Sequence, residues 1–156
     1  MISVLAAAEQ VREAGRPFAP AGDGAIALID PRDVGAVAAA VLTSDGHDGR
    51  TYELTGPEAL TYRDIAEALS AAGGRRIEYV DVPAHAAHES LVAAGMPPWL
   101  IEHLDGAYEL VRRGELAHTT DAVRMLTGRD PRTFAAFARD HAGLFAADVA
   151  RAALTG

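Results

Sequence analysis

A short run of alternating side chains, followed by a break, organises the pattern of apolar and polar positions. In Arg50–Thr55, Tyr52 and Leu54 fall on one face of the chain, and the residues on the other face are polar. This period of two is typical of a β-strand. Gly56-Pro57 interrupts the alternation, because neither residue readily continues a strand. We therefore predict a strand that ends at Thr55.

A helix is predicted shortly after this strand. Thr61 and Asp64 have the spacing of an N-cap residue and its N3 partner, an aspartate variant of the capping box. Apolar residues then recur at helical spacing until Gly73-Gly74, at Ile65, Ala66, Leu69 and Ala72. A second apolar strand is predicted at Ile77–Val82. The order strand, helix, strand predicts a βαβ unit with at least two parallel strands.

The other periodic segments predict more helices and one further strand. The strand is Ala25–Ile29, and Asp30 and Pro31 after it have the pattern of an N-cap and a first helical residue. Asp33 would occupy N3 of that helix, so we interpret Asp30 and Asp33 as caps rather than catalysts. The other helices are expected at Val4–Ala14, Pro83–Ala94, Pro97–Arg113, Thr119–Leu126 and Asp130–Ala142. Residues 1–156 are expected to form one α/β domain, with about three strands covered by several helices.

Composition removes several classes of function. The chain has no cysteine, which excludes disulfides, thiolate metal sites and cysteine nucleophiles, and fits a cytoplasmic protein. All 14 basic side chains are arginine, so no catalytic or phosphate-binding lysine is present. The net charge of −8 argues against a nucleic-acid partner. The apolar runs are short and Ala-rich, and they predict neither a membrane span nor a leader peptide.

Two neighbouring helices carry most of the candidate chemistry. His85, His88 and Glu89 lie within about one helical turn and could converge as acid/base groups or around a divalent metal. The spacing is not HExxH and no third metal ligand is evident, so we predict no metal site. A solvated polar helix face explains the same three residues equally simply.

The next helix combines apolar rings with polar tips, a composition that suits the wall of a small-molecule pocket. The residues concerned are Trp99, His103, Tyr108 and Arg112. We predict His103 and Tyr108 as catalytic groups and Trp99 and Arg112 as substrate contacts, although ordinary core and surface roles remain open. His118 is a further catalytic candidate if Asp121 orients its imidazole. Asp121 could also be a first-turn acid that favours the helix dipole.

The order of these segments resembles the C-terminal, substrate-binding part of the NmrA-like, atypical short-chain dehydrogenase/reductase family. The resemblance rests on the segments Pro20–Leu42, Tyr52–Ser70, Ile77–Val82 and Leu126–Phe145. In that family an N-terminal Rossmann half supplies a glycine-rich turn for a dinucleotide pyrophosphate. Neither GxGxxG nor GxxGxxG occurs in this chain, and Gly22-Asp23-Gly24 precedes a predicted strand rather than a helix. We therefore assign no cofactor and no cofactor-binding residue.

Three functions remain open. The first is a stand-alone, non-redox cyclase, isomerase or dehydratase that acts on a hydrophobic small molecule, such as a natural-product intermediate, by acid/base catalysis. The second is the substrate-binding half of a split NAD(P)-dependent oxidoreductase. The third is a ligand-sensing or scaffold module without catalysis. A homodimer or a complementary Rossmann-type chain is the expected protein partner, because the strand at Thr51–Thr55 has little to protect its edge.

Overall fold

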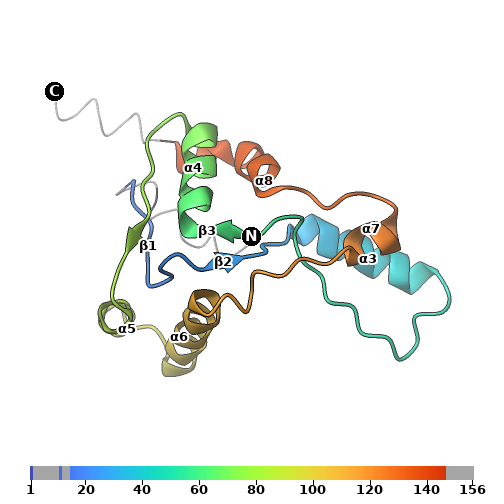
Figure 1. Ribbon diagram of the computed structural model, residues 1–156, viewed down its shortest axis with the longest axis horizontal. Coiled ribbons are helices and arrows are strands. Elements are labelled where there is room, and N and C mark those ends of the chain that lie inside the picture. Colours follow the sequence, from blue (N-terminus) through green and yellow to red (C-terminus); the bar gives the residue numbers. More distant parts are fainter. Residues whose placement is uncertain (2–10, 12–14, 147–156) are drawn as a thin grey trace.

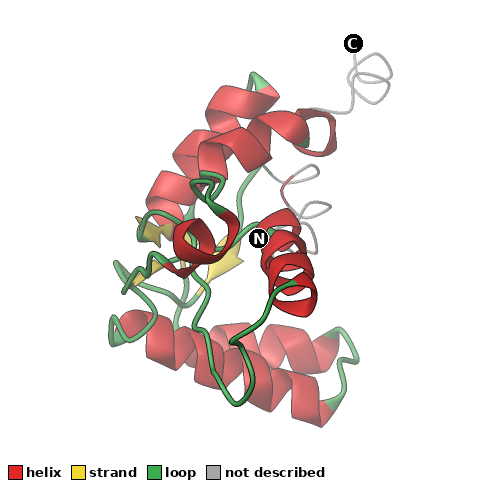
Figure 2. Ribbon diagram, turned by 90° about the vertical axis from the view of Figure 1, so that its right-hand side faces the viewer, coloured by secondary structure: helices red, strands yellow, loops and turns green. Residues whose placement is uncertain are grey.

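The computed structural model describes Met1, Val11 and residues 15–146, and Figure 1 shows how their helices are arranged in pairs. Helix α4 packs against α8 and α9, α3 packs against α7, and α5 packs against α6. The very short strands lie between these pairs, as the side view in Figure 2 shows. The α/β class with a small amount of sheet and several helices is confirmed. The predicted helix at Val4–Ala14 lies outside the described residues apart from Val11.

Both strongly capped helices form where the sequence predicts them. Helix α3 spans Pro31–Thr43 after the N-cap Asp30, whose side chain accepts a hydrogen bond from the Arg32 N–H. Helix α4 spans Tyr62–Gly73 and has the complete capping box. The Thr61 N–H donates to Asp64 Oδ2 at 2.8 Å, and the Asp64 N–H donates to Thr61 Oγ1 at 3.2 Å. Local side-chain chemistry is sufficient to start both helices.

The strand arrangement differs from the predicted three-stranded sheet. Strand β1 (Phe18–Ala19) pairs in parallel with β4 (Val80–Asp81), and β2 (Ala25–Ile26) pairs antiparallel with β3 (Leu60–Thr61). The predicted strand at Arg50–Thr55 is wrong, because these residues join no ladder among the described residues. The predicted βαβ unit is therefore also wrong, since β4 has β1 as its parallel partner.

Side chains, rather than a backbone ladder, tie the segment Thr51–Thr55 to the loop before α7. Thr120 Oγ1 donates to the Glu53 carbonyl at 2.8 Å, and the Thr120 N–H donates to Thr55 Oγ1 at 2.8 Å. The following Gly56 N–H donates to the Ala27 carbonyl at 3.4 Å. Threonine hydroxyls compete effectively with backbone groups for such bonds, which explains why an alternating pattern produces an extended segment without strand partners.

The helices in the second half of the chain form where the sequence predicts them, except that α7 and α8 begin later than predicted. Helix α5 spans Ala84–Ala93, α6 spans Pro98–Arg112 and α7 spans Ala122–Thr127. The helix predicted from Asp130 begins later, as α8 (Phe134–Asp140), with Thr133 as its N-cap. It is followed by α9 (Ala142–Phe145). Thr119 and Thr120 do not cap α7, because Thr120 is bound to Glu53 and Thr55.

A buried hydrophobic core forms where α4 meets α8 and α9. Its aromatic members are Phe134, Phe137 and Phe145, each at most 2% exposed, and its aliphatic members include Ile65 and Leu69. Val11 and Ile77 also belong to this cluster, so the chain before β1 and the chain before β4 converge on α4. Burial of these apolar side chains is the main favourable contribution to folding.

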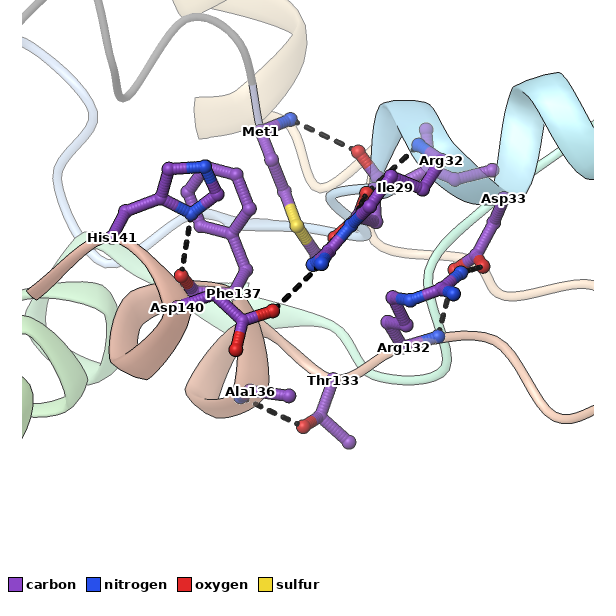
Figure 3. A network of polar contacts seen from close by, with 11 residues as sticks. Met1, Ile29, Arg32, Asp33, Arg132, Thr133, Ala136, Phe137, Asp140 and His141 are labelled. Atoms are coloured by element: carbon purple, nitrogen blue, oxygen red, sulfur yellow. Dashed lines mark hydrogen bonds and ion pairs between the residues drawn. The ribbon is translucent and has the colours of Figure 1, made fainter.

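The start of α3 is connected to α8 and to the segment before it, through Arg32 with Asp140 and through Asp33 with Arg132, as Figure 3 shows. Asp30 is 1% exposed and binds the guanidinium of Arg32, which also contacts Asp140 at 2.7 Å. Asp33 is 3% exposed and accepts hydrogen bonds from both the backbone N–H and the guanidinium of Arg132. Both aspartates therefore hold the fold together, with Asp33 making a tertiary ion pair that its N3 position alone does not predict.

Replacing Asp30 with alanine should lower the free energy of unfolding by about 2 kcal/mol, because both the N-cap bond and the buried contact to Arg32 are lost. The hydrogen bonds from Arg32 lower the pKa of Asp30. A lowered pKa adds stability above the unfolded-state pKa of an aspartate, and this stability disappears as the pH falls through the folded-state value. Urea unfolding at neutral and acid pH should therefore show the difference between native protein and variant shrinking in acid. Asp45→Ala removes an exposed carboxyl and is the control. A difference in the free energy of unfolding between native protein and Asp30→Ala that does not change with pH would contradict this account.

Candidate active site between helices α5 and α6

A cavity of about 360 Å³ opens between α5, α6 and the loop at Pro20. Two helix faces and one loop residue line it: Pro20, then Ala84, His85 and His88 from α5, then Asp105, Tyr108, Glu109 and Arg112 from α6. Tyr108 and Glu109 each lie three or four positions from both Asp105 and Arg112, so the four residues from α6 share one broad face of the helix. The cavity is large enough for a small organic ligand.

An imidazole and a carboxylate face each other across the two helices. His88 Nδ1 lies 2.7 Å from Asp105 Oδ2, and both side chains are partly exposed. With Asp105 ionised, Nδ1 donates this hydrogen bond, which fixes the orientation of the ring. No other hydrogen bond joins the ring to a described residue, so Nε2 is available to a ligand.

Three tyrosine rings lie in contact in a row, and one of them, Tyr108, lines the cavity. The ring of Tyr62 lies 5.5 Å from that of Tyr79 and 6.1 Å from that of Tyr108, measured between centroids. Burial raises the pKa of Tyr62 and Tyr108, and it raises that of Tyr79 to about 12. All three hydroxyls are therefore protonated at neutral pH. Tyr108, which lines the cavity, therefore has a hydroxyl that can donate a hydrogen bond but is not a base at neutral pH.

Hydrogen bonds to β4 and the residue before it hold the loop that carries Pro20. The Tyr79 hydroxyl accepts from the Ala21 N–H at 3.1 Å, and Asp81 Oδ1 accepts from the Gly22 N–H at 2.9 Å. Gly22 has a φ of 56°, a conformation that glycine adopts without strain. These bonds hold in place the loop that contributes Pro20 to the cavity wall.

Four of the seven predicted site residues come together at this cavity, namely His85, His88, Tyr108 and Arg112. The other three are elsewhere. His103 and Trp99 lie on exposed parts of α6, with Trp99 68% exposed. His118 binds Glu53, with Nε2 and Oε1 2.7 Å apart, so the predicted pairing with Asp121 is wrong. The chemical roles of all seven residues stay predictions.

Sequence reasoning missed Asp105 and Glu109. Asp105 lies three residues before Tyr108 and Glu109 lies three residues before Arg112, so helical spacing alone places them on the same face. The partner of His88 could therefore have been found by following the helical face from Tyr108.

The described residues do not form a site for a metal ion or for a dinucleotide pyrophosphate. They contain no cluster of three or more potential metal ligands, and no helix long and apolar enough to cross a bilayer. The turn at Gly22 leads into strand β2. The Gly22 N–H already donates a hydrogen bond to the Asp81 carboxylate. A pyrophosphate requires free N–H groups at a helix start after such a turn.

Comparison with known proteins shows a clear relationship to reductases. The chain is 41% identical over 147 residues to an NAD(P)H azoreductase of Xenophilus azovorans, covering 94% of this chain and 51% of that protein. It also matches the crystal structure of an NADPH-dependent quinone oxidoreductase from Escherichia coli, with a TM-score of 0.81 and 29% identity, over 89% of this chain and 50% of that one. This chain is a relative of NAD(P)H-dependent oxidoreductases.

A third relative is the (4-alkanoyl-5-oxo-2,5-dihydrofuran-3-yl)methyl phosphate reductase of Streptomyces griseus, 40% identical over 146 residues, which are 94% of this chain and 51% of that protein. No family model matches the sequence. The relationship to these oxidoreductases supports the resemblance to the NmrA-like family. The chain spans about half the length of the curated relatives it matches.

These relatives correct the first functional interpretation. A stand-alone, non-redox cyclase, isomerase or dehydratase is wrong, because the relatives are reductases. The reason for the error is physical. The absence of a glycine-rich pyrophosphate turn from this sequence does not exclude redox chemistry, because the part of a reductase that binds the electron acceptor does not itself need such a turn.

Proposed function

We propose that this chain forms the acceptor-binding part of an NAD(P)H-dependent oxidoreductase that reduces a small conjugated molecule, such as a quinone or an azo compound. The observation that carries the proposal is the cavity between α5 and α6, with Tyr108 in its wall, in a chain 41% identical to an NAD(P)H azoreductase. We expect a separate part, of the dinucleotide-binding kind, to hold the cofactor that supplies the hydride. Homodimer formation stays an additional prediction.

The cavity residues suit a planar acceptor. Tyr108 offers a ring face backed by Tyr62 and a protonated hydroxyl that can donate to a carbonyl or azo group. His88, oriented by Asp105, offers a second polar contact from the other helix. In this arrangement the chain's own residues bind and orient the acceptor, and reduction depends on the hydride donor held elsewhere.

Acceptor binding by the protein tests this proposal. We expect calorimetry to show saturable binding of 1,4-naphthoquinone, and Tyr108→Ala to weaken it about tenfold, because the aromatic contact and the hydroxyl are both lost. Tyr52→Ala removes a tyrosine that instead contacts His47 through its hydroxyl, and should leave binding unchanged. Absence of saturable binding, or equal effects of the two substitutions, would overturn the proposal.

A further inference from the structure

The charged side chains that line the cavity differ in whether they already have an ion-pair partner. Its lining includes two carboxylates, Asp105 and Glu109, and one permanently charged cation, Arg112. Asp105 is bound to His88 at 2.7 Å. Glu109 is bound to Arg113, one residue beyond Arg112, at 2.9 Å. Both carboxylates therefore already have a partner that is not Arg112.

Arg112 itself has much weaker contacts. Its Nη1 lies 3.5 Å from the Pro20 carbonyl, at the limit of a hydrogen bond, and it forms no ion pair with any described residue. Asp81, which binds the same loop, accepts from the Gly22 N–H and contacts the Tyr79 hydroxyl instead. A guanidinium carries five N–H donors, so most of those on Arg112 are available at the cavity.

The guanidinium of Arg112 nevertheless lies against a loop that is itself held in place. It lies against Gly22, where an added Cβ would be 3.8 Å from Nη1, and Gly22 belongs to the loop held by Tyr79 and Asp81. Tyr108 precedes Arg112 by one helical turn on the same face of α6. A ligand that places its ring on Tyr108 would therefore have a forked cation about one turn, roughly 5 Å, further along the helix.

We propose that Arg112 is the anion-binding group of this cavity, and that the preferred acceptor carries an anionic substituent, such as a sulfonate, carboxylate or phosphate, beside its conjugated ring. Guanidinium binds such planar or tetrahedral oxyanions through two parallel hydrogen bonds. This inference rests on the proposed function and adds the charge of the substrate to it.

A matched pair of ligands tests the inference. Calorimetry at low salt compares 1,4-naphthoquinone with 1,4-naphthoquinone-2-sulfonate, which differ only in the anionic group. We expect the sulfonate to bind about tenfold more tightly than the uncharged quinone, and Arg112→Gln to abolish this preference. Raising the ionic strength should reduce the preference, because the guanidinium is partly exposed.

A charge-matched control separates local binding from the overall field. Arg139→Gln removes one positive charge from α8, outside the cavity lining, and should keep the preference for the sulfonate. Thermal unfolding of each variant verifies that the fold is intact. Equal affinities for the two quinones in the native protein, or a preference retained in Arg112→Gln, would overturn the inference. Failure of both quinones to bind would instead overturn the proposed function.

The anion could also belong to the dinucleotide rather than to the acceptor. Titration of the native protein and of Arg112→Gln with NADP⁺ alone distinguishes the two sources. We expect NADP⁺ binding to be the same in both proteins. Binding of NADP⁺ that depends on Arg112, together with no preference for the sulfonate, would assign Arg112 to a cofactor phosphate and overturn the inference.

Discussion

Alanine at Gly56 should unfold or severely destabilise the protein, with a loss of more than about 4 kcal/mol in the free energy of unfolding. A Cβ built on Gly56 would lie 2.0 Å from the Leu28 carbonyl oxygen and 2.9 Å from its carbonyl carbon. Both are backbone atoms, so no side-chain rotation relieves the overlap. The affected contact joins the segment after Thr55 to the chain that leads from β2 into α3.

A second glycine gives the matched control for Gly56. Gly35 lies inside α3, and a Cβ built there meets no heavy atom within 4 Å. Gly35→Ala should therefore raise the free energy of unfolding by about 0.5–1 kcal/mol through helix propensity. Urea titrations followed by circular dichroism measure both variants. If Gly56→Ala unfolded at the same urea concentration as the native protein, the close approach to Leu28 would be disproved.

Phe137→Ala is the next most damaging change that we expect, at about 3–5 kcal/mol. Phe137 is 2% exposed in the cluster between α4 and α8, and its ring contacts the tilted ring of His141, with centroids 4.3 Å apart. Truncation would leave a cavity beside Phe134 that the rigid helices cannot close. The measurement is again equilibrium unfolding in urea.

A comparison substitution tests whether burial is the reason. Leu42, on α3, is 84% exposed, so Leu42→Ala should change the free energy of unfolding by less than about 0.5 kcal/mol. Phe137→Leu should give an intermediate loss, because it retains much of the buried apolar volume. Comparable losses for Phe137→Ala and Leu42→Ala would show that the α4–α8 cluster is not the main core.

The features that the sequence predicts well are those set by near neighbours. The starts of α3 and α4 depend on Asp30 and on Thr61 with Asp64, whose hydrogen bonds span two or three residues. The face of α6 that lines the cavity follows from helical spacing in the same way. Such interactions can be recognised without knowing where the rest of the chain lies.

The features that the sequence does not predict depend on distant partners. Nothing near Thr51–Thr55 indicates that Thr120, 65 residues after Thr55, will bind it through side chains. The pairing of Asp33 with Arg132 spans 99 residues, and it lies just before the N-cap Thr133 that starts α8. An alternating pattern and an Asp-Pro pair are compatible with several local structures, and these tertiary contacts select among them.

Helix α5 contributes two histidines to the cavity although none of its own residues is buried. Side chains on α5 can therefore be exchanged during evolution with little effect on folding, because the core around α4 does not depend on them. The opposite wall, with Tyr79 and Asp81 bound into the Pro20 loop, has far less freedom to vary. Sequence differences between relatives should consequently accumulate on α5, while the other side of the cavity keeps its shape.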